Sequence, residues 1–199
     1  MKLVQSILTK NDCYKSGRKV TVKGLMLHSV GCPQSNASVF VKNWNRSDLE
    51  ACVHGFIDGN TGTVYQTLPW NHRGWHAGGA ANNTHIGVEM CEPACIKYTS
   101  GANFTCSDLT TAKAVAKRTY EAAVELFASL CKQYGLDPMK DGVIISHREG
   151  CARGLASNQE GRTSRHEGRG CNYYPHRRKA HHRRHRGHSE ALFGAGNNP

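Results

Sequence analysis

Two apolar runs of strand length each end in a histidine, and the rest of the chain is interpreted around them. The runs are Gly24–His28 and Gly142–His147, each closed by a turn signal. Side chains alternate along a strand, so Met26 and His28 are predicted to share one face. Ligands of α/β sheets bind beyond the carboxyl ends of strands. The two histidines are therefore either metal ligands that meet at one sheet edge or separate hydrogen-bonded strand ends.

The hydrophobic pattern predicts five strands, two helices and a tight turn in a fixed order. The long helix has an apolar stripe, Ser107 as N-cap and Gly135 as C-cap. Residues 1–21 and 93–106 are interpreted as turn-rich or loop, and residues 69–81 as a loop that carries His72, Trp75 and His76. The predicted elements are strands 22–28, 52–58, 63–67, 85–91 and 143–147, helices 37–45 and 107–135, and a hairpin turn at 59–62. This order predicts an α/β fold, with a central mixed β-sheet flanked by helices.

The strand 85–91 places a carboxylate where a buried side chain is expected. Ile86 and Val88 alternate with Glu89, so Glu89 shares a face with His85. A buried carboxylate is costly unless it is paired with a cation or used in chemistry, and both interpretations stay open. A zinc hydrolase needs three protein ligands, an open position for water and a carboxylate that is not a ligand. The candidates that gather at one sheet edge and its loops are His28, His54, His76, Glu89 and His147.

Six short motifs, in order over residues 20–158, resemble one family. The chain is similar to the type-2 N-acetylmuramoyl-L-alanine amidases, zinc-dependent peptidoglycan amidases related to peptidoglycan recognition proteins, and most of all to phage and prophage lysins. The motifs are Leu27–Gly31, Val53–Asp58, Gly62–Gln66, Gly74–Gly78, His85–Glu89 and Ile145–Gly150.

The resemblance implies a site and a reaction. His28 and His147 would be ligands of Zn²⁺, and Glu89 would be the catalytic glutamate. His54, His76 and Trp75 would line the groove and contact substrate. The expected reaction is hydrolysis of the amide between the lactyl group of N-acetylmuramic acid and L-alanine in peptidoglycan.

The chain departs from the family pattern at two places. Some members have a tyrosine where this chain has Val53. Relatives also continue into a His-Gly-Asp-Pro segment whose aspartate is the third zinc ligand, and that position is Gly161 here. Glu160 is the nearest carboxylate and the tentative third ligand, with His166 as a poorer candidate. The missing aspartate would allow a rival interpretation, in which the same fold binds peptidoglycan without cleaving it.

The positive charge of the chain is concentrated at its C-terminal end. Residues 1–161 hold 17 Lys or Arg and 13 Asp or Glu, whereas residues 162–199 hold 9 and 2. The sequence therefore predicts an amidase domain over 1–158 that is incomplete at its C-terminal end, and a basic tail over 159–199. With so few apolar residues the tail is expected to be disordered. It is a natural basic arm, a histidine-rich metal binder or a segment read out of frame. Nucleic-acid binding is expected only non-specifically, through this tail.

The cysteines, the apolar stretches and the N-terminus give expectations about the redox state and the location of the protein. The nine cysteines are scattered, and Cys91, Cys95 and Cys106 match no standard zinc spacing, so most cysteines are expected to be reduced core residues. No stretch has the length of a membrane span, and the N-terminus has too short an apolar run for a secretory signal. We expect a monomer that is made in the cytoplasm and acts on the cell wall after release.

Overall fold

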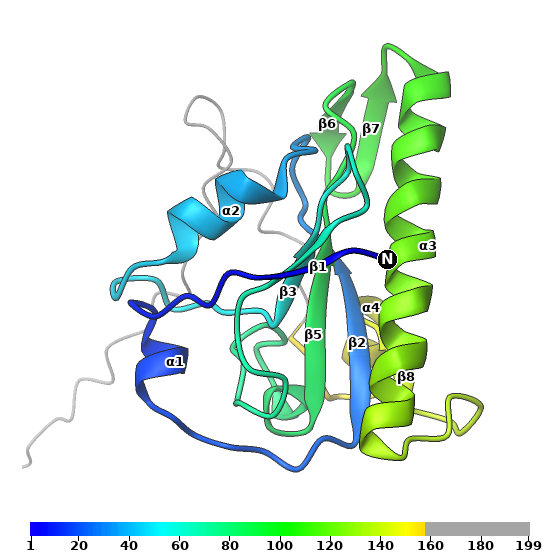
Figure 1. Ribbon diagram of the computed structural model, residues 1–199. Coiled ribbons are helices and arrows are strands. Elements are labelled where there is room, and N and C mark those ends of the chain that lie inside the picture. The colour runs from blue at the N-terminus through cyan, green and yellow to red at the C-terminus, as the bar shows by residue number, and fades with distance from the viewer. Residues whose placement is uncertain (158–199) are drawn as a thin grey trace, which may run out of the picture.

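The computed structural model describes residues 1–157, and these residues form an α/β domain around one mixed sheet (Figure 1). Neighbouring strands are parallel except β3 and β4, which form the predicted hairpin. This architecture confirms the predicted fold class. The strands, in their order across the sheet, are β1 (Leu3–Gln5), β4 (Val64–Gln66), β3 (Gly55–Ile57), β5 (His85–Met90), β2 (Gly24–Ser29) and β8 (Ile144–Ser146).

The longest helix, α3 (Leu109–Tyr134), begins and ends where its capping residues allow. The Asp108 side chain accepts a hydrogen bond from the Thr111 amide, so Asp108 and not Ser107 is the N-cap. Gly135 ends the helix with a φ of 63°, a left-handed conformation that favours glycine. The shorter helices are α1 (Asp12–Lys15), α2 (Ala37–Trp44), the 3₁₀ turn η1 (Ala80–Asn83) and α4 (His147–Ala152).

The two faces of the sheet are covered by different helices, as Figure 1 shows with α2 and α3 on opposite sides. Strand β3 illustrates the division, because its Phe56 stacks on Phe40 of α2 while Ile57 packs in the cluster that contains Phe127 of α3. Leu25, Ile86 and Val88 also belong to the α3 side. Since alternate residues point to opposite faces, His28 and Glu89 lie on the face away from α3.

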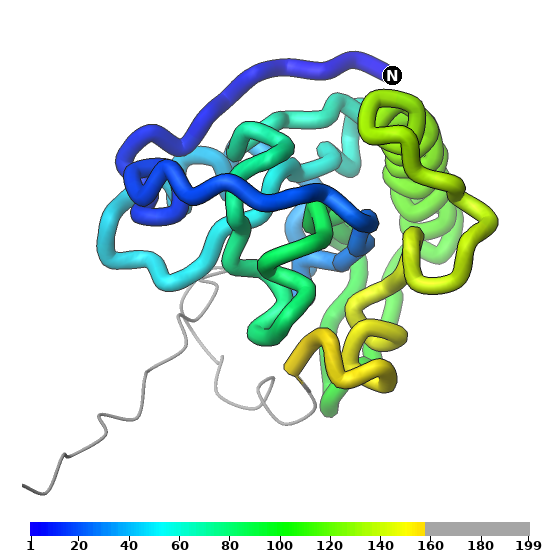
Figure 2. The backbone as a smooth tube through the Cα atoms, turned by 90° about the horizontal axis from the view of Figure 1, so that it is seen from below, coloured from blue at the N-terminus to red at the C-terminus, as the bar shows by residue number. Residues whose placement is uncertain are grey.

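The strands differ from the prediction at two places, one in a separate two-stranded sheet and one at the edge of the main sheet. Residues 93–106 are not a loop, because they contain an antiparallel hairpin of β6 (Ile96–Ser100) and β7 (Asn103–Cys106). Residues 1–21 contain the edge strand β1, which pairs in parallel with β4. Figure 2 shows the N-terminal segment and the segment that ends at residue 157 on opposite sides of the molecule, as expected for the two edges.

Within the described part of the chain, none of the helices combines the length and the apolar character needed to cross a bilayer.

Candidate functional site: a chain of histidines beside a buried glutamate

Three histidine side chains and two backbone carbonyls form a continuous chain of close polar contacts on the face of the sheet away from α3. Nδ1 of His147 lies 3.1 Å from Nδ1 of His28, and Nε2 of His28 lies 3.0 Å from Nδ1 of His76. At the far ends, His76 Nε2 lies 3.1 Å from the carbonyl of His85, and His147 Nε2 lies 2.9 Å from the carbonyl of Ser157. The predicted residues His28, His76 and His147 are therefore brought together.

The carbonyls at both ends fix which ring nitrogens carry hydrogen. A carbonyl can only accept, so His76 Nε2 and His147 Nε2 are donors. In neutral rings their Nδ1 atoms are then acceptors, and His28 must donate from Nε2 to His76. Burial lowers the pKa of His28 to about 3 and holds that of His76 well below its usual value, so these rings are neutral at pH 7. When the His147 ring is neutral too, the Nδ1 lone pairs of His28 and His147 face each other.

This pair of nitrogens has the chemistry of half a zinc site. Neutral imidazoles are common zinc ligands, and at Zn–N distances of about 2.0–2.1 Å a tetrahedral ion holds its nitrogen ligands roughly 3.3 Å apart. The observed 3.1 Å separation fits that arrangement. Residues 1–157 supply no group of three His, Cys, Asp or Glu side chains arranged to hold a metal. Glu160, the tentative third ligand, lies outside the described residues.

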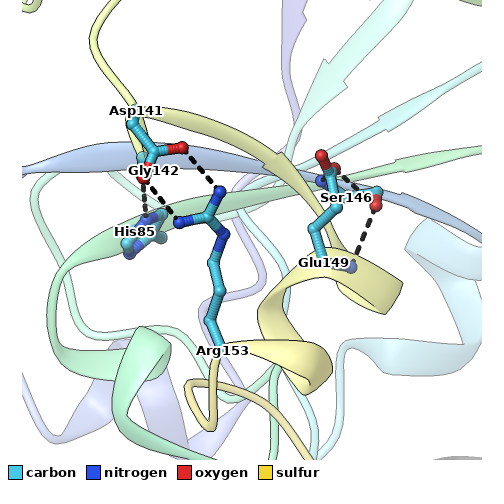
Figure 3. Close-up of polar contacts among 6 residues, drawn as sticks. All are labelled: His85, Asp141, Gly142, Ser146, Glu149 and Arg153. Atoms are coloured by element: carbon cyan, nitrogen blue, oxygen red, sulfur yellow. Dashed lines mark hydrogen bonds and ion pairs between the residues drawn. The ribbon is translucent and has the colours of Figure 1, made fainter.

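His147 is presented by a helix start and not by the end of a strand, which corrects the predicted strand 143–147. Strand β8 ends at Ser146, and His147 is the first residue of α4. The Ser146 side chain accepts from the Glu149 amide, while the Glu149 carboxylate accepts from the Ser146 amide at 2.7 Å (Figure 3). This capping box fixes the turn from which His147 projects.

The other end of α4 is tied to the loop before β8. The Arg153 guanidinium donates two hydrogen bonds to Asp141, at 2.6 and 2.8 Å (Figure 3). This bidentate pair lowers the pKa of Asp141. In the same view Nε2 of His85 donates to the carbonyl of Gly142, which joins β5 to that loop. Helix α4 is thus held at both ends relative to the sheet.

Glu89 is a buried carboxyl group next to the histidines. It is the register partner of His28 across the parallel pair β2 and β5, so the two side chains share a face. Its side chain is 5 % exposed, and its Oε2 atom has no hydrogen-bond partner within the described residues. None of the ion pairs found in residues 1–157 includes Glu89, so those residues supply no Arg or Lys partner. Burial, and then the charge of Glu92, raise its pKa well above the usual value.

Glu92 is a second buried carboxyl group that sequence reasoning missed. It accepts hydrogen bonds from the Ser29 hydroxyl, from the Gly31 amide at 3.0 Å and from the Tyr98 hydroxyl at 2.8 Å. It therefore connects the loop after His28 to the hairpin of β6 and β7. Its position just after strand β5, three residues beyond Glu89, is the signal that could have drawn attention to it.

His54 lies beneath this cluster and is fully buried. Its Nε2 donates to the carbonyl of His72 at 2.8 Å, and its Nδ1 accepts from the Gly87 amide at 3.0 Å. Trp75 is partly buried against the core cluster that includes Cys52, to which its backbone pairs. Substrate contact by His54, His76 and Trp75 stays a prediction. His72 stands apart, with its ring stacked on Tyr14 and near the Lys19 ammonium.

These pKa shifts predict that the metal-free protein is less stable in mild acid. Burial lowers the pKa of His28, His54 and His76 from 6.5. As the pH falls below 6.5, these three side chains therefore bind protons in the unfolded chain but stay neutral in the folded chain. Glu89 and Glu92 have pKa values raised from 4.5, so the folded chain binds up to two protons at these groups that the unfolded chain does not. These two protons partly offset the effect of the three histidines. We expect the free energy of unfolding to fall by about 1.4 kcal/mol per pH unit between pH 6.5 and 4.5.

Urea denaturation in the presence of a chelator measures this dependence. The Glu89→Gln variant is the matched control, because it removes one opposing carboxyl group and should steepen the loss. A free energy of unfolding that stays constant or rises as the pH falls from 6.5 to 4.5 would contradict the assignment of neutral buried histidines.

The fold and these groups define a class: an α/β domain with metal-type histidines and a buried carboxyl group at one face of its sheet. The family model described as N-acetylmuramoyl-L-alanine amidase matches residues 17–168. That match covers more than half of the chain, and the chain therefore belongs to the N-acetylmuramoyl-L-alanine amidase family. The match continues past residue 158, where the motif resemblance was predicted to end.

Two curated relatives carry the name of this family. The amidases XlyA and CwlH of Bacillus subtilis are each 35% identical to this chain, over 78 and 79 residues. Each match covers 38% of this chain, but only 25% and 30% of the two relatives. The chain thus matches less than a third of the length of these relatives.

Among solved structures, the catalytic domain of XlyA superposes with a TM-score of 0.57 at 20% identity, covering 75% of this chain and 86% of that one. The structure of PlyL superposes with a TM-score of 0.56 at 16% identity, and the match covers 75% of this chain and 82% of PlyL. The hydrolase AmiA of Staphylococcus aureus, solved with its ligand, superposes with a TM-score of 0.53 at 20% identity. That match covers 80% of this chain and 72% of AmiA. At these identities the superpositions show the shared fold.

Proposed function

We propose that this domain is a zinc-dependent N-acetylmuramoyl-L-alanine amidase that hydrolyses the amide between the lactyl group of N-acetylmuramic acid and L-alanine in peptidoglycan. The single observation that carries the proposal is the approach of Nδ1 of His28 to Nδ1 of His147 at 3.1 Å, with the buried Glu89 in register beside His28. Family membership supplies the reaction class, and the histidine pair and Glu89 supply groups suited to it.

In this proposal each group has a separate task. His28 and His147 would hold a zinc ion through Nδ1, and a bound ion would supply polarisation of the scissile carbonyl and a lowered pKa of a water molecule. Glu89 would act as general base toward the attacking water molecule and would then protonate the leaving amine of L-alanine. A glutamate whose pKa is raised by burial suits both proton transfers, because its pKa then lies nearer the working pH.

The surroundings of the site support the same roles. The Nε2–H of His147 is held by the Ser157 carbonyl and that of His28 by His76, so neither ring can turn without losing a hydrogen bond. Glu89 has little access to solvent, which strengthens its interaction with a nearby cation. His54, His76 and Trp75 are proposed to shape the substrate side of the site. The proposed partner is a muramyl peptide of the cell wall, met after release from the cell.

Zinc binding should depend on the two ligand histidines and not on other histidines nearby. We expect His28→Ala and His147→Ala each to lower zinc occupancy, because each removes one of two facing nitrogen donors. His72→Ala is the matched control, since its ring contacts Lys19 and Tyr14 instead of the cluster. Elemental analysis after equilibrium dialysis against a fixed concentration of zinc measures the zinc content. Equal zinc in all three variants would show that His28 and His147 are not the ligands.

Hydrolysis of purified cell walls tests the reaction itself. Slow release of free L-alanine amino groups from walls incubated with the chain and added zinc is the expected result, and a chelator should abolish it. Binding to walls without any release of amino groups, with zinc present, would favour the rival non-catalytic interpretation. Truncation of residues 159–199 should leave wall binding in place if the domain, and not the basic tail, recognises peptidoglycan.

A further inference from the structure

We infer that His76 is a positioning residue for the metal centre: it accepts the Nε2–H of His28 and thereby holds the Nδ1 lone pair of His28 toward His147. This inference rests on the proposed function, because it explains how this chain orients one of its zinc ligands. It assigns His76 a task different from the substrate contact predicted from sequence.

The contacts of His76 leave its ring one orientation. Nε2 donates to the His85 carbonyl at 3.1 Å, which leaves Nδ1 as the acceptor for His28 at 3.0 Å. The backbone is fixed as well, since the Asn82 side chain accepts from the amides of His76 and Ala77, both at 2.8 Å. His76 therefore connects His28 to the backbone of β5 through two directional bonds.

Two glycines pack directly against the His76 ring, and neither position has room for a Cβ atom. A Cβ atom at Gly87 would lie 2.4 Å from Cγ and Nδ1 of His76. A Cβ atom at Gly74 would lie 2.9 Å from Cδ2 of His76 and 2.8 Å from Cε1 of His54. The ring thus lies where any larger residue at position 87 or 74 would displace it. His76 is only 3 % exposed, so a ligand in solution has little access to it.

The consequence for His28 is chemical. A neutral histidine in water exchanges its hydrogen between the two ring nitrogens, and only the form with hydrogen on Nε2 offers Nδ1 to a metal. Histidine ligands of metals usually donate their second ring N–H to a fixed acceptor, and removing that acceptor typically costs 10–100-fold in metal affinity. For His147 the acceptor is the carbonyl of Ser157, and for His28 it is the imidazole of His76.

The tautomer of His28 in the full, metal-free chain is the first test. Long-range ¹H–¹⁵N NMR correlations of the labelled protein are expected to show His28 with hydrogen on Nε2 and His76 with hydrogen on Nε2. His28 with hydrogen mainly on Nδ1 would overturn the inference. This measurement needs neither zinc nor a substitution, so it separates this inference from the proposed function, which fails if the unaltered chain binds no zinc.

Zinc affinity of matched variants is the second test, measured by competition with a chromophoric chelator. His76→Leu keeps the size but removes the acceptor, and we expect about a 10–100-fold weaker affinity with an unchanged circular dichroism spectrum. His76→Gln should restore most of the affinity, because its amide can accept from His28 and donate to the His85 carbonyl. His72→Leu, from the same loop, is the control. A folded His76→Leu variant with the affinity of the unaltered chain would overturn the inference.

Discussion

Replacing Glu89 by glutamine is expected to lower the rate of peptidoglycan hydrolysis by about 10²–10⁴-fold, the usual loss when a general base is removed. The substitution keeps the size of the side chain and removes only its ability to accept and release a proton. Glu89 lies in register with His28, and its Oε2 has no partner in the described residues, so no ion pair is broken by the change. Folding and zinc content should therefore stay close to those of the parent.

Glu92→Gln is the matched control for this prediction. Glu92 is also a buried carboxyl group on the same segment, but its oxygens accept from Ser29, Gly31 and Tyr98. An amide oxygen can keep part of that pattern, and the loss of rate should be far smaller than for Glu89→Gln. Initial rates of wall hydrolysis measure both, in the most active version of the domain. Equal and small losses in the two variants would show that Glu89 is structural.

The parts of the fold that were predicted correctly are those with a strong local pattern. Strands β2 and β5 are largely buried and alternate apolar residues along one face, and α3 carries an apolar stripe between good capping residues, so periodicity alone finds them. Strand β1 was missed because it has three residues, and its identity as a strand comes from pairing with β4, some sixty residues later. The hairpin of β6 and β7 was missed because most of its residues are exposed and polar.

The same holds for the candidate site: residues marked by a local sequence pattern were predicted, and residues whose role depends on contacts distant in sequence were not. The two apolar runs that end in a histidine pointed to His28 and His147, and strand periodicity placed Glu89 on an inward position. The roles of Glu92 and His76 depend on which distant groups they meet, namely Tyr98 of a hairpin and the His85 carbonyl, and no local spacing encodes those contacts. The start of α4 was predictable from Ser146 and Glu149, whose spacing is that of a capping box.

The chain as it stands is expected to bind zinc weakly and to hydrolyse walls poorly, because residues 1–157 supply only two facing nitrogen donors. In the family pattern the third ligand is an aspartate, at the position that Gly161 occupies here. Glu160 is one residue out of register. His166 lies further along, and fixing the intervening backbone would cost about 1–2 kcal/mol per residue.

The combined substitution Gln159→His, Glu160→Gly and Gly161→Asp should therefore raise zinc occupancy toward one ion per chain and increase the rate of wall hydrolysis. The control carries asparagine instead of aspartate at position 161, because an amide lacks the charge of a carboxylate ligand. Zinc content by elemental analysis and rates on purified walls should rise together in the aspartate variant and stay low in the asparagine variant. A parent chain that already holds one zinc tightly and clears walls at an ordinary enzyme rate would contradict this argument, and Glu160 would then be the residue to test as the third ligand.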